Sequence, residues 1–247
     1  MLSPCRSAIR WVWDNLLIRP APRCLDPYGS HVPVLLILAT CLKPRRVLEL
    51  GCGVYSTLTF LDVHSFPSLE HLVSVETDPE WLERVGAMVR SDPRWQPRMV
   101  EGASSVADWL RFGGTSLAID EFDLILVDDS ANDIQRRQTL GALFCARPTP
   151  PIVVHDVECA RLRTRLWTRR PYVVFDAFNP QTGLCNLGAG AELSKLKHAN
   201  AVLRTLRNQA LAARNLQEWV AVGRAAIGQL DMSTHIADLK PRMTRRV

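Results

Sequence analysis

The sequence has no long uninterrupted hydrophobic run. Its longest apolar stretch, Val32 to Leu42, includes a proline and a threonine. It is about half as long as the ~20 residues that a membrane-spanning helix needs. The stretch from Met1 to Arg19 is interrupted and of amphipathic type, without the basic start and apolar centre of a secretory signal. We therefore expect a cytoplasmic protein that does not associate with membranes.

Paired cysteines are also lacking. The seven cysteines are an odd number, and no two have C-x-x-C spacing. This pattern predicts neither a disulfide framework nor a zinc ribbon, so we expect reduced, structural thiols. Disordered and fibrous classes are excluded because 47% of the residues are hydrophobic and 22% are charged, as in soluble globular proteins.

Neither sign of charge is in excess over most of the chain. Residues 192–247 hold 10 Lys and Arg against 4 Asp and Glu, whereas residues 1–191 hold 20 against 21, which together give the net charge of +5. A basic segment can bind nucleic acid. However, Leu203, Leu206, Ala210 and Ala213 have the spacing of an ordinary amphipathic helix, and Trp219 is the single aromatic residue of the segment. Nucleic acid is therefore not the favoured partner, and an RNA-binding tail remains an alternative.

Between these ends, short apolar runs alternate with helix-type patterns. Strands are predicted at 45–50, 71–76, 98–100, 122–127 and 151–154, and helices at 33–42, 56–63, 79–89, 106–112 and 135–145. Runs that are apolar almost throughout are typical of a parallel sheet covered on both faces. Two further runs, 172–178 and 183–187, are separated by too few residues for a parallel crossover and must form an antiparallel hairpin.

The predicted fold class is therefore α/β, a doubly wound and mostly parallel seven-stranded sheet that ends in an antiparallel β-hairpin. Residues 1–29 are expected to be an N-terminal extension, 30–190 the sheet domain, and 191–247 a basic helical C-terminal extension. Helix is predicted from 191 to about 229, with no clear pattern past Asp231.

Residues just after the strands are the candidates for ligand binding, because an open parallel sheet binds ligands at its carboxyl edge. Gly51 and Gly53 follow the first strand, and Glu76 ends the second, where a ribose-binding carboxylate is placed. A dinucleotide site would have a small third residue where Ser56 stands. S-adenosylmethionine carries an ammonium and a sulfonium, and Glu49 before the turn suits such a cationic group.

These motifs resemble those of the class I, Rossmann-like S-adenosylmethionine-dependent methyltransferases. The resemblance covers about residues 30–190 and is carried by GCGVYSTL at 51–58, SVETDPEW at 74–81, EGASS at 101–105, VDD at 127–129 and VVHD at 153–156. It implies that S-adenosylmethionine is the cofactor, and that its site includes Glu49, Gly51, Gly53, Tyr55, Ser56, Glu76, Thr77, Ala103, Ser104 and Asp128. Tyr55 is a departure, because many relatives have a third glycine there.

Methyl transfer needs a base only when the acceptor atom carries a proton. Asp128, His155 and Asp156 follow the fourth and fifth strands and are the catalytic candidates. The alternative for His155 is a structural bond to a carboxylate. Asp128, Asp129 and Asp156 also suggest a divalent metal, as in catechol-type methyltransferases, but those show Asp-Asn after strand five where this chain has Asp156-Val157. Metal dependence is not favoured.

The sequence thus predicts an S-adenosylmethionine-dependent methyltransferase that acts on an oxygen or nitrogen atom of a small-molecule or sugar-like acceptor. The D/N-P-P-Y/F motif of nucleic-acid amino-methyltransferases is absent, because Asp128-Asp129-Ser130 stands in its place. Three alternatives remain: a non-catalytic binding or scaffold protein with this fold, an RNA-directed methyltransferase that uses the basic tail, and a nicotinamide-dependent oxidoreductase. The oligomeric state stays open, with a homodimer among the candidates.

Overall fold

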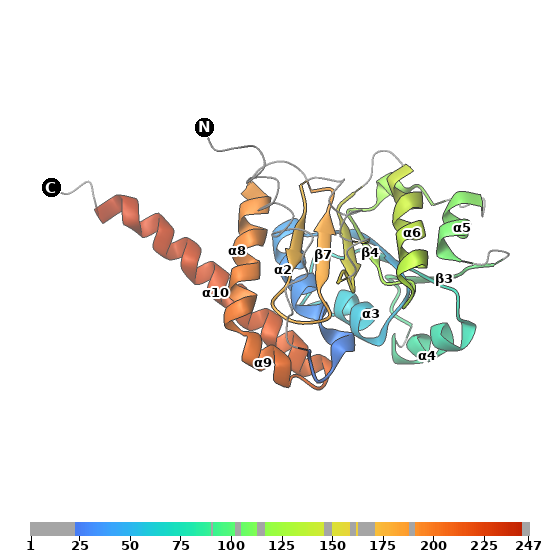
Figure 1. Ribbon diagram of the computed structural model, residues 1–247, viewed down its shortest axis with the longest axis horizontal. Coiled ribbons are helices and arrows are strands. Elements are labelled where there is room, and N and C mark those ends of the chain that lie inside the picture. The colour runs from blue at the N-terminus through green and yellow to red at the C-terminus, as the bar shows by residue number, and fades with distance from the viewer. Residues whose placement is uncertain are drawn as a thin grey trace, which may run out of the picture.

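The structure is a computed structural model, shown as a ribbon in Figure 1. It describes residues 23–89, 91–101, 105–112, 117–145, 150–158, 162, 171–187 and 191–243. The helical elements are η1 (Pro27–Gly29), α2 (Val32–Leu42), α3 (Val54–Leu61), α4 (Pro79–Val89), α5 (Val106–Phe112), η2 (Ile119–Glu121), α6 (Asp133–Cys145), α8 (Ala191–Thr205), α9 (Arg207–Ala212) and α10 (Leu216–Met243). The strands are β1 (Arg46–Leu50), β2 (His71–Glu76), β3 (Trp95–Met99), β4 (Leu124–Val127), β5 (Ile152–His155), β6 (Val173–Phe175) and β7 (Thr182–Cys185).

The seven strands form one sheet in the order β3-β2-β1-β4-β5-β7-β6. The pairings from β3 through β5 are parallel, whereas β7 is antiparallel to both β5 and β6. The predicted fold class is confirmed: a doubly wound, mostly parallel α/β sheet with an antiparallel hairpin at one end. It is also the fold that the resemblance to Rossmann-like methyltransferases implied.

Buried side chains form an apolar cluster on each face of the sheet. Successive residues of a strand point to opposite faces, so Val47 of β1 belongs to the cluster under α2, α3, α4, α8, α9 and α10, while Leu48 and Leu50 belong to the cluster under α5 and α6. Central strands buried on both faces explain why their sequences are apolar almost throughout.

The predicted third strand, 98–100, is displaced from β3 at Trp95–Met99. β3 contains Pro97, and three of its five residues are exposed. It lies at the edge of the sheet, where a proline is tolerated because no further strand needs its missing N–H. An exposed edge strand with a proline has little of the apolar pattern by which strands are predicted.

The helical segment predicted from 191 to about 229 is confirmed as helical, but it is three helices and it extends further. α10 continues past Asp231 to Met243, where the sequence predicted no pattern. Its N-cap is Asn215, whose Oδ1 accepts from the Glu218 amide at 3.0 Å and whose Nδ2 donates to Glu218 Oε1 at 3.0 Å.

These C-terminal helices share one core with the sheet domain. The side chains of Leu203, Leu206, Ala210 and Ala213 are buried, as their amphipathic spacing predicted. Trp219 of α10 is fully buried beside Gly29, and the added Cβ of an alanine at Gly29 would come within 2.1 Å of the indole. In Figure 1, α10 crosses behind α8 and reaches the region of α2. Residues 191–230 therefore complete the core on one face of the sheet.

No helix in the described parts of the chain combines the length and the apolar character needed to cross a bilayer.

Candidate functional site

A cleft of about 1140 Å³ opens at the carboxyl ends of β1, β2, β4 and β5. Strand order reverses between β1 and β4, which is where open α/β sheets bind their ligands. The cleft is lined by Gly51 and Gly53 after β1, Glu76 at the end of β2, Asp128 after β4 and His155 at the end of β5. Most of the predicted site residues therefore share one cavity.

The turn between β1 and α3 can be made only with glycine at position 51. Gly51 has a positive φ of 86°, and its amide donates to Val75 O at 2.8 Å. An added Cβ at Gly51 would lie 2.3 Å from the carbonyl oxygen of Asp128. This close approach holds the end of β1 against the start of the segment after β4. The cleft residues that follow these two strands therefore have a fixed spacing.

Glu76 is anchored at the cleft wall by backbone amides. Its Oε2 accepts from the amide of Cys52 at 3.1 Å, and its Oε1 accepts from the amides of Thr77 at 2.7 Å and Asp78 at 3.0 Å. The Thr77 hydroxyl also donates to Glu76 Oε1, at 3.2 Å. Thr77, a predicted cofactor-binding residue, does not itself line the cleft. The carboxylate therefore has a fixed orientation, and Oε2, which accepts only the Cys52 amide, keeps a lone pair for a ribose hydroxyl.

Tyr55 and Ser56, at the start of α3, both line the cleft. The Tyr55 hydroxyl donates to Asp26 Oδ2, which joins the glycine turn to the segment before η1. Burial, together with the bond to Asp26, raises the pKa of Tyr55 to about 12. The phenol thus stays protonated and serves as a fixed donor.

Glu49 does not line the cleft. It lies on the α3 face of β1, is fully buried, and accepts from Thr57 Oγ1 at 2.8 Å and from Ser74 Oγ. Burial raises the pKa of Glu49 to about 7, although hydrogen bonds from Ser56, Ser74 and Thr57 act in the opposite direction. Glu49 could therefore meet the cationic end of the cofactor only from beneath the glycine turn, and not from the cleft wall.

Replacement of Glu49 by Gln is expected to stabilise the protein in a pH-dependent way. A carboxyl whose folded pKa is raised favours folding below its unfolded pKa, near 4.5, and loses that contribution as pH rises to about 7. From pH 5 to pH 8 the unfolding free energy of Glu49→Gln should rise relative to wild type by roughly 3 kcal/mol. Urea denaturation of both proteins without cofactor measures the difference, and a gap independent of pH would contradict the buried protonated state.

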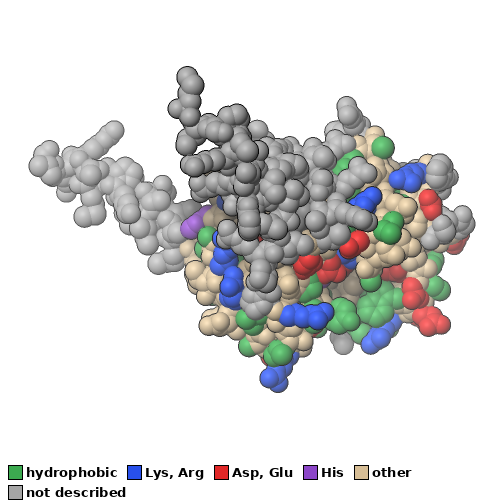
Figure 2. Space-filling view, viewed as in Figure 1, with side chains coloured by type: hydrophobic (Ala, Val, Ile, Leu, Met, Phe, Trp, Pro, Cys, Tyr) green, Lys and Arg blue, Asp and Glu red, His purple; other side chains and the backbone are tan. Residues whose placement is uncertain are grey.

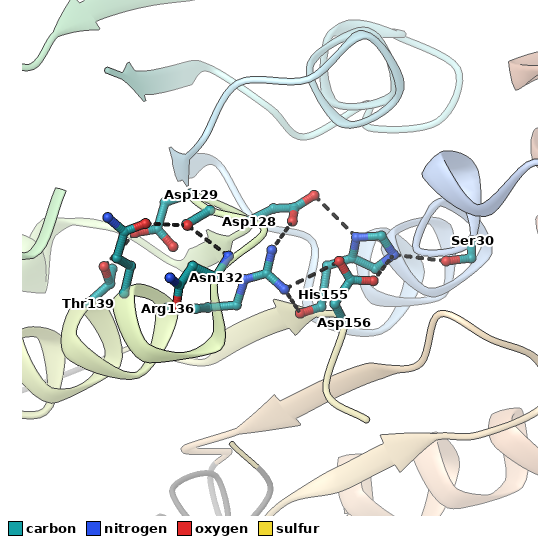
Figure 3. Close-up of polar contacts among 10 residues, drawn as sticks. Ser30, Asp128, Asp129, Asn132, Arg136, Thr139, His155 and Asp156 are labelled. Carbon is teal, nitrogen blue, oxygen red and sulfur yellow. Dashed lines mark hydrogen bonds and ion pairs between the residues drawn. The ribbon is translucent and has the colours of Figure 1, made fainter. Parts of the chain in front are cut away.

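The predicted catalytic residues Asp128, His155 and Asp156 lie together, and a buried arginine joins them (Figure 3). Asp128 Oδ2 is 3.2 Å from His155 Nδ1, and Asp156 Oδ1 is 3.7 Å from His155 Nε2. Arg136 donates to Asp128 Oδ1 at 2.8 Å and to the carbonyl of His155 at 2.8 Å, and lies 3.4 Å from Asp156 Oδ2. Arg136 therefore fixes the ends of β4 and β5 relative to each other.

Opposite charges set the ionisation of this cluster. Burial works against the charge of His155, but the Asp128 charge and hydrogen bond, with Asp156, outweigh it and raise its pKa above the ordinary value. Burial likewise opposes the charge of Asp128, but His155 and Arg136 outweigh it and lower its pKa. Asp128 and His155 therefore each favour the charged form of the other.

Ser30 gives His155 its third contact, with Oγ 2.8 Å from Nε2. Ser30, His155 and Asp128 thus have the order of contacts found in serine hydrolases. Ser30, however, is fully buried and does not line the cleft, so no substrate carbonyl can reach its oxygen. Its role is to orient the imidazole.

Asp129 and its neighbours do not form a site of three carboxylates. Asp129 Oδ2 accepts from the Thr139 hydroxyl of α6, and burial raises the pKa of Asp129. The residues that lie close enough to share one metal ion, within the described chain, are His31, Asp128 and His155. Asp129 and Asp156 are not part of this group.

Ala103 and Ser104 of the predicted cofactor site lie outside the described residues. Sequence reasoning missed Arg136, His31 and Ser30. Arg136 stands beside another arginine on a helix of low mean hydropathy, and no local pattern distinguishes the buried one. His31 and Ser30 precede α2, and only the fold brings them to β5.

No protein-family model matches the chain, and no curated protein sequence matches it. Solved structures do resemble it in fold. The O-methyltransferase TomG from Streptomyces achromogenes, in complex with SAM, is 18% identical, with 76% of this chain and 100% of that chain covered and a TM-score of 0.45. The N-methyltransferase NodS from Bradyrhizobium japonicum, in complex with S-adenosyl-L-homocysteine, is 16% identical, with 65% and 87% covered and a TM-score of 0.43.

Spermidine synthase from Thermotoga maritima is 17% identical, with 78% of this chain and 68% of that chain covered and a TM-score of 0.48. At such identities the likeness is one of fold alone.

Proposed function

We propose that the protein is an S-adenosylmethionine-dependent methyltransferase that acts on an oxygen or nitrogen atom of a small-molecule or sugar-like acceptor. One observation carries the proposal. The two motifs that resemble a cofactor site, the glycine turn at Gly51–Gly53 and the carboxylate of Glu76, form one wall of the cleft and are joined by the hydrogen bond from Cys52 to Glu76.

The charge of the cleft favours this cofactor over a dinucleotide. Its described lining holds six carboxylates, from Glu76, Asp78, Asp128, Asp129, Asp156 and Glu158, against the guanidinium groups of Arg23, Arg84 and Arg136. Figure 2 shows acidic side chains gathered near the middle of one face of the molecule. A pyrophosphate would be repelled by such a surface, whereas an ammonium and a sulfonium would be attracted.

The turn itself offers few donors to a phosphate. Phosphate sites use free amides at the start of a helix. Here the amide of Cys52 donates to Glu76, and the amide of Gly53 donates to Thr57 Oγ1 at 3.2 Å. Both donors are thus already used within the protein, which again disfavours a dinucleotide.

For the transfer step, we propose that Asp128, His155 and Asp156 hold the acceptor and take up its proton. They lie across the cleft from Glu76, at the ends of different strands. Correct placement of the acceptor supplies much of the rate of an in-line displacement, because the sulfonium is a good leaving group. Arg136 and Ser30 would act through these residues by fixing their orientation.

The test is calorimetric titration with S-adenosylmethionine and, separately, with NAD. Micromolar binding of S-adenosylmethionine is expected, and Glu76→Ala should weaken it about 10- to 100-fold, because a charge-assisted hydrogen bond to the ribose contributes about 1.5–3 kcal/mol. Glu80→Ala is the matched control, since Glu80 is an exposed carboxylate on α4 outside the cleft lining. Its binding should equal that of wild type.

Circular dichroism of each variant shows whether the fold is kept. Preference for NAD, or no binding of S-adenosylmethionine by folded wild type, would contradict the proposal. A screen of acceptors with a labelled methyl donor then distinguishes an enzyme from a scaffold protein that binds the cofactor without transfer.

A further inference from the structure

Three ligand-type side chains converge at the bottom of the cleft from three separate segments. His31 stands at the start of α2, Asp128 follows β4, and His155 ends β5. One ligand atom from each lies within 4.8 Å of the others, and all three residues line the cleft. A small ion could therefore reach them from solvent.

His31 is the residue that points to a bound ligand. It is only 2% exposed, and neither of its ring nitrogens has a hydrogen-bond partner among the described residues. Its ring stands edge-on to that of His155, with centroids 4.5 Å apart. A buried polar atom without a partner costs about 1–3 kcal/mol. No part of the methyl-transfer site described above uses this imidazole.

Asp128 and His155 each have a hydrogen-bond partner of the kind that orients metal ligands. Asp128 Oδ1 accepts from Arg136, and an ion at Oδ2 would replace the hydrogen bond between Oδ2 and His155 Nδ1. His155 Nε2 bonds Ser30, which leaves Nδ1, the nitrogen 3.2 Å from Asp128 Oδ2. Metal-binding histidines commonly donate their second nitrogen to such a partner, which fixes the tautomer.

We propose that His31, Asp128 and His155 bind a divalent first-row transition-metal ion of the zinc type. Two imidazole nitrogens and one carboxylate favour such ions over Mg²⁺ or Ca²⁺, which prefer oxygen ligands. Tetrahedral ligands about 2.0–2.2 Å from zinc lie roughly 3.4 Å apart, so the group must close by on the order of 1 Å. A fourth ligand would come from the cleft, which all three residues line.

This site differs from the oxygen-ligand magnesium site that the sequence analysis considered and did not favour. It shares Asp128 and His155 with the proposed function, but binding is measured without cofactor or acceptor, so the failure of one proposal is distinguished from the failure of the other. If the protein is a methyltransferase, an ion here would lower the pKa of an acceptor hydroxyl bound to it.

The experiment titrates untagged, metal-free protein with Co²⁺, whose visible absorption reports nitrogen ligands, and then displaces Co²⁺ with Zn²⁺. One equivalent should bind with a micromolar or lower Kd, and His31→Gln should weaken binding at least 100-fold. His64→Gln is the matched control, because His64 is exposed and away from the cleft, and it should bind as wild type does.

NMR spectroscopy of wild type and of His31→Gln gives a second readout. In imidazole NMR spectra, Zn²⁺ should shift two of the six histidines strongly, and the same two signals should be lost or moved by His31→Gln. Absence of binding, equal binding by wild type and His31→Gln, or Mg²⁺ bound in preference to Zn²⁺ would overturn the proposal.

Discussion

Gly51→Ala is expected to lower the free energy of unfolding by at least 3 kcal/mol and to abolish cofactor binding. An alanine at φ 86° is strained, and its Cβ would meet backbone atoms of the neighbouring segment, 2.3 Å from Asp128 O and 2.7 Å from Asp129 Cα. Backbone cannot rotate away as a side chain can. The ends of β1 and β4 would have to separate, although Asp128 N donates to Leu50 O there at 2.8 Å.

Two other glycines serve as controls for Gly51→Ala in urea denaturation. Gly53 has an ordinary extended φ of −142°, and its added Cβ would meet only the Ser56 hydroxyl, so Gly53→Ala should cost less. Gly228 lies on α10 with nothing within 4 Å of an added Cβ, and Gly228→Ala should leave stability unchanged or raise it by up to about 1 kcal/mol. Equal effects at positions 51 and 228 would refute the steric explanation.

Trp219→Ala is expected to lower the free energy of unfolding by about 3–5 kcal/mol, the usual loss for a buried tryptophan. Trp219 is fully buried, its indole contacts the backbone position of Gly29, and its ring centroid is 5.4 Å from that of Phe178. The residue belongs to the segment that the sequence predicted to be an extension. A loss of this size, measured by chemical denaturation, requires that α10 be part of the cooperative core.

The matched comparison is Trp219→Phe, which keeps most of the apolar volume. The indole nitrogen has no hydrogen-bond partner among the described residues, so its removal leaves no buried group unpaired. Trp219→Phe should therefore cost clearly less than Trp219→Ala. A separate, earlier transition for α10 in either variant, detected by two probes, would mean that the C-terminal helices form an independent unit.

The fold was predictable because local patterns agree with it. β2 has the bounds that its apolar run predicted, and the close spacing of β6 and β7 required an antiparallel pair. β3 was displaced because an edge strand needs no apolar pattern. The length of α10 was missed because helix propagation costs little once a helix is nucleated. Its start, where Asn215 caps the helix, was not predicted either, because the sequence pattern predicted one helical segment from 191 to about 229.

The site could be predicted from the sequence only for residues at or just after the end of a strand, because chain order alone places these at the carboxyl edge of the sheet. Asp128, His155 and Asp156 lie together because parallel strands end at one edge. The orientation of Glu49 depends on which face of β1 it occupies, and the sequence left that face undetermined. The burial of Arg136 and His31 arises from packing between distant elements, which no local pattern reveals.

The contact between α10 and α2 also sets the timing of folding during synthesis. α2 is made early, yet the residues of α10 that cover it, such as Gly223 over Leu36, follow roughly 180 residues later, about ten to forty seconds at typical ribosome rates. Until then the apolar surface that α2 presents to α10 lacks its cover, and the N-cap of α2 is the cleft residue His31. We therefore expect the packing beneath this side of the cleft to be complete only after α10 has been synthesised.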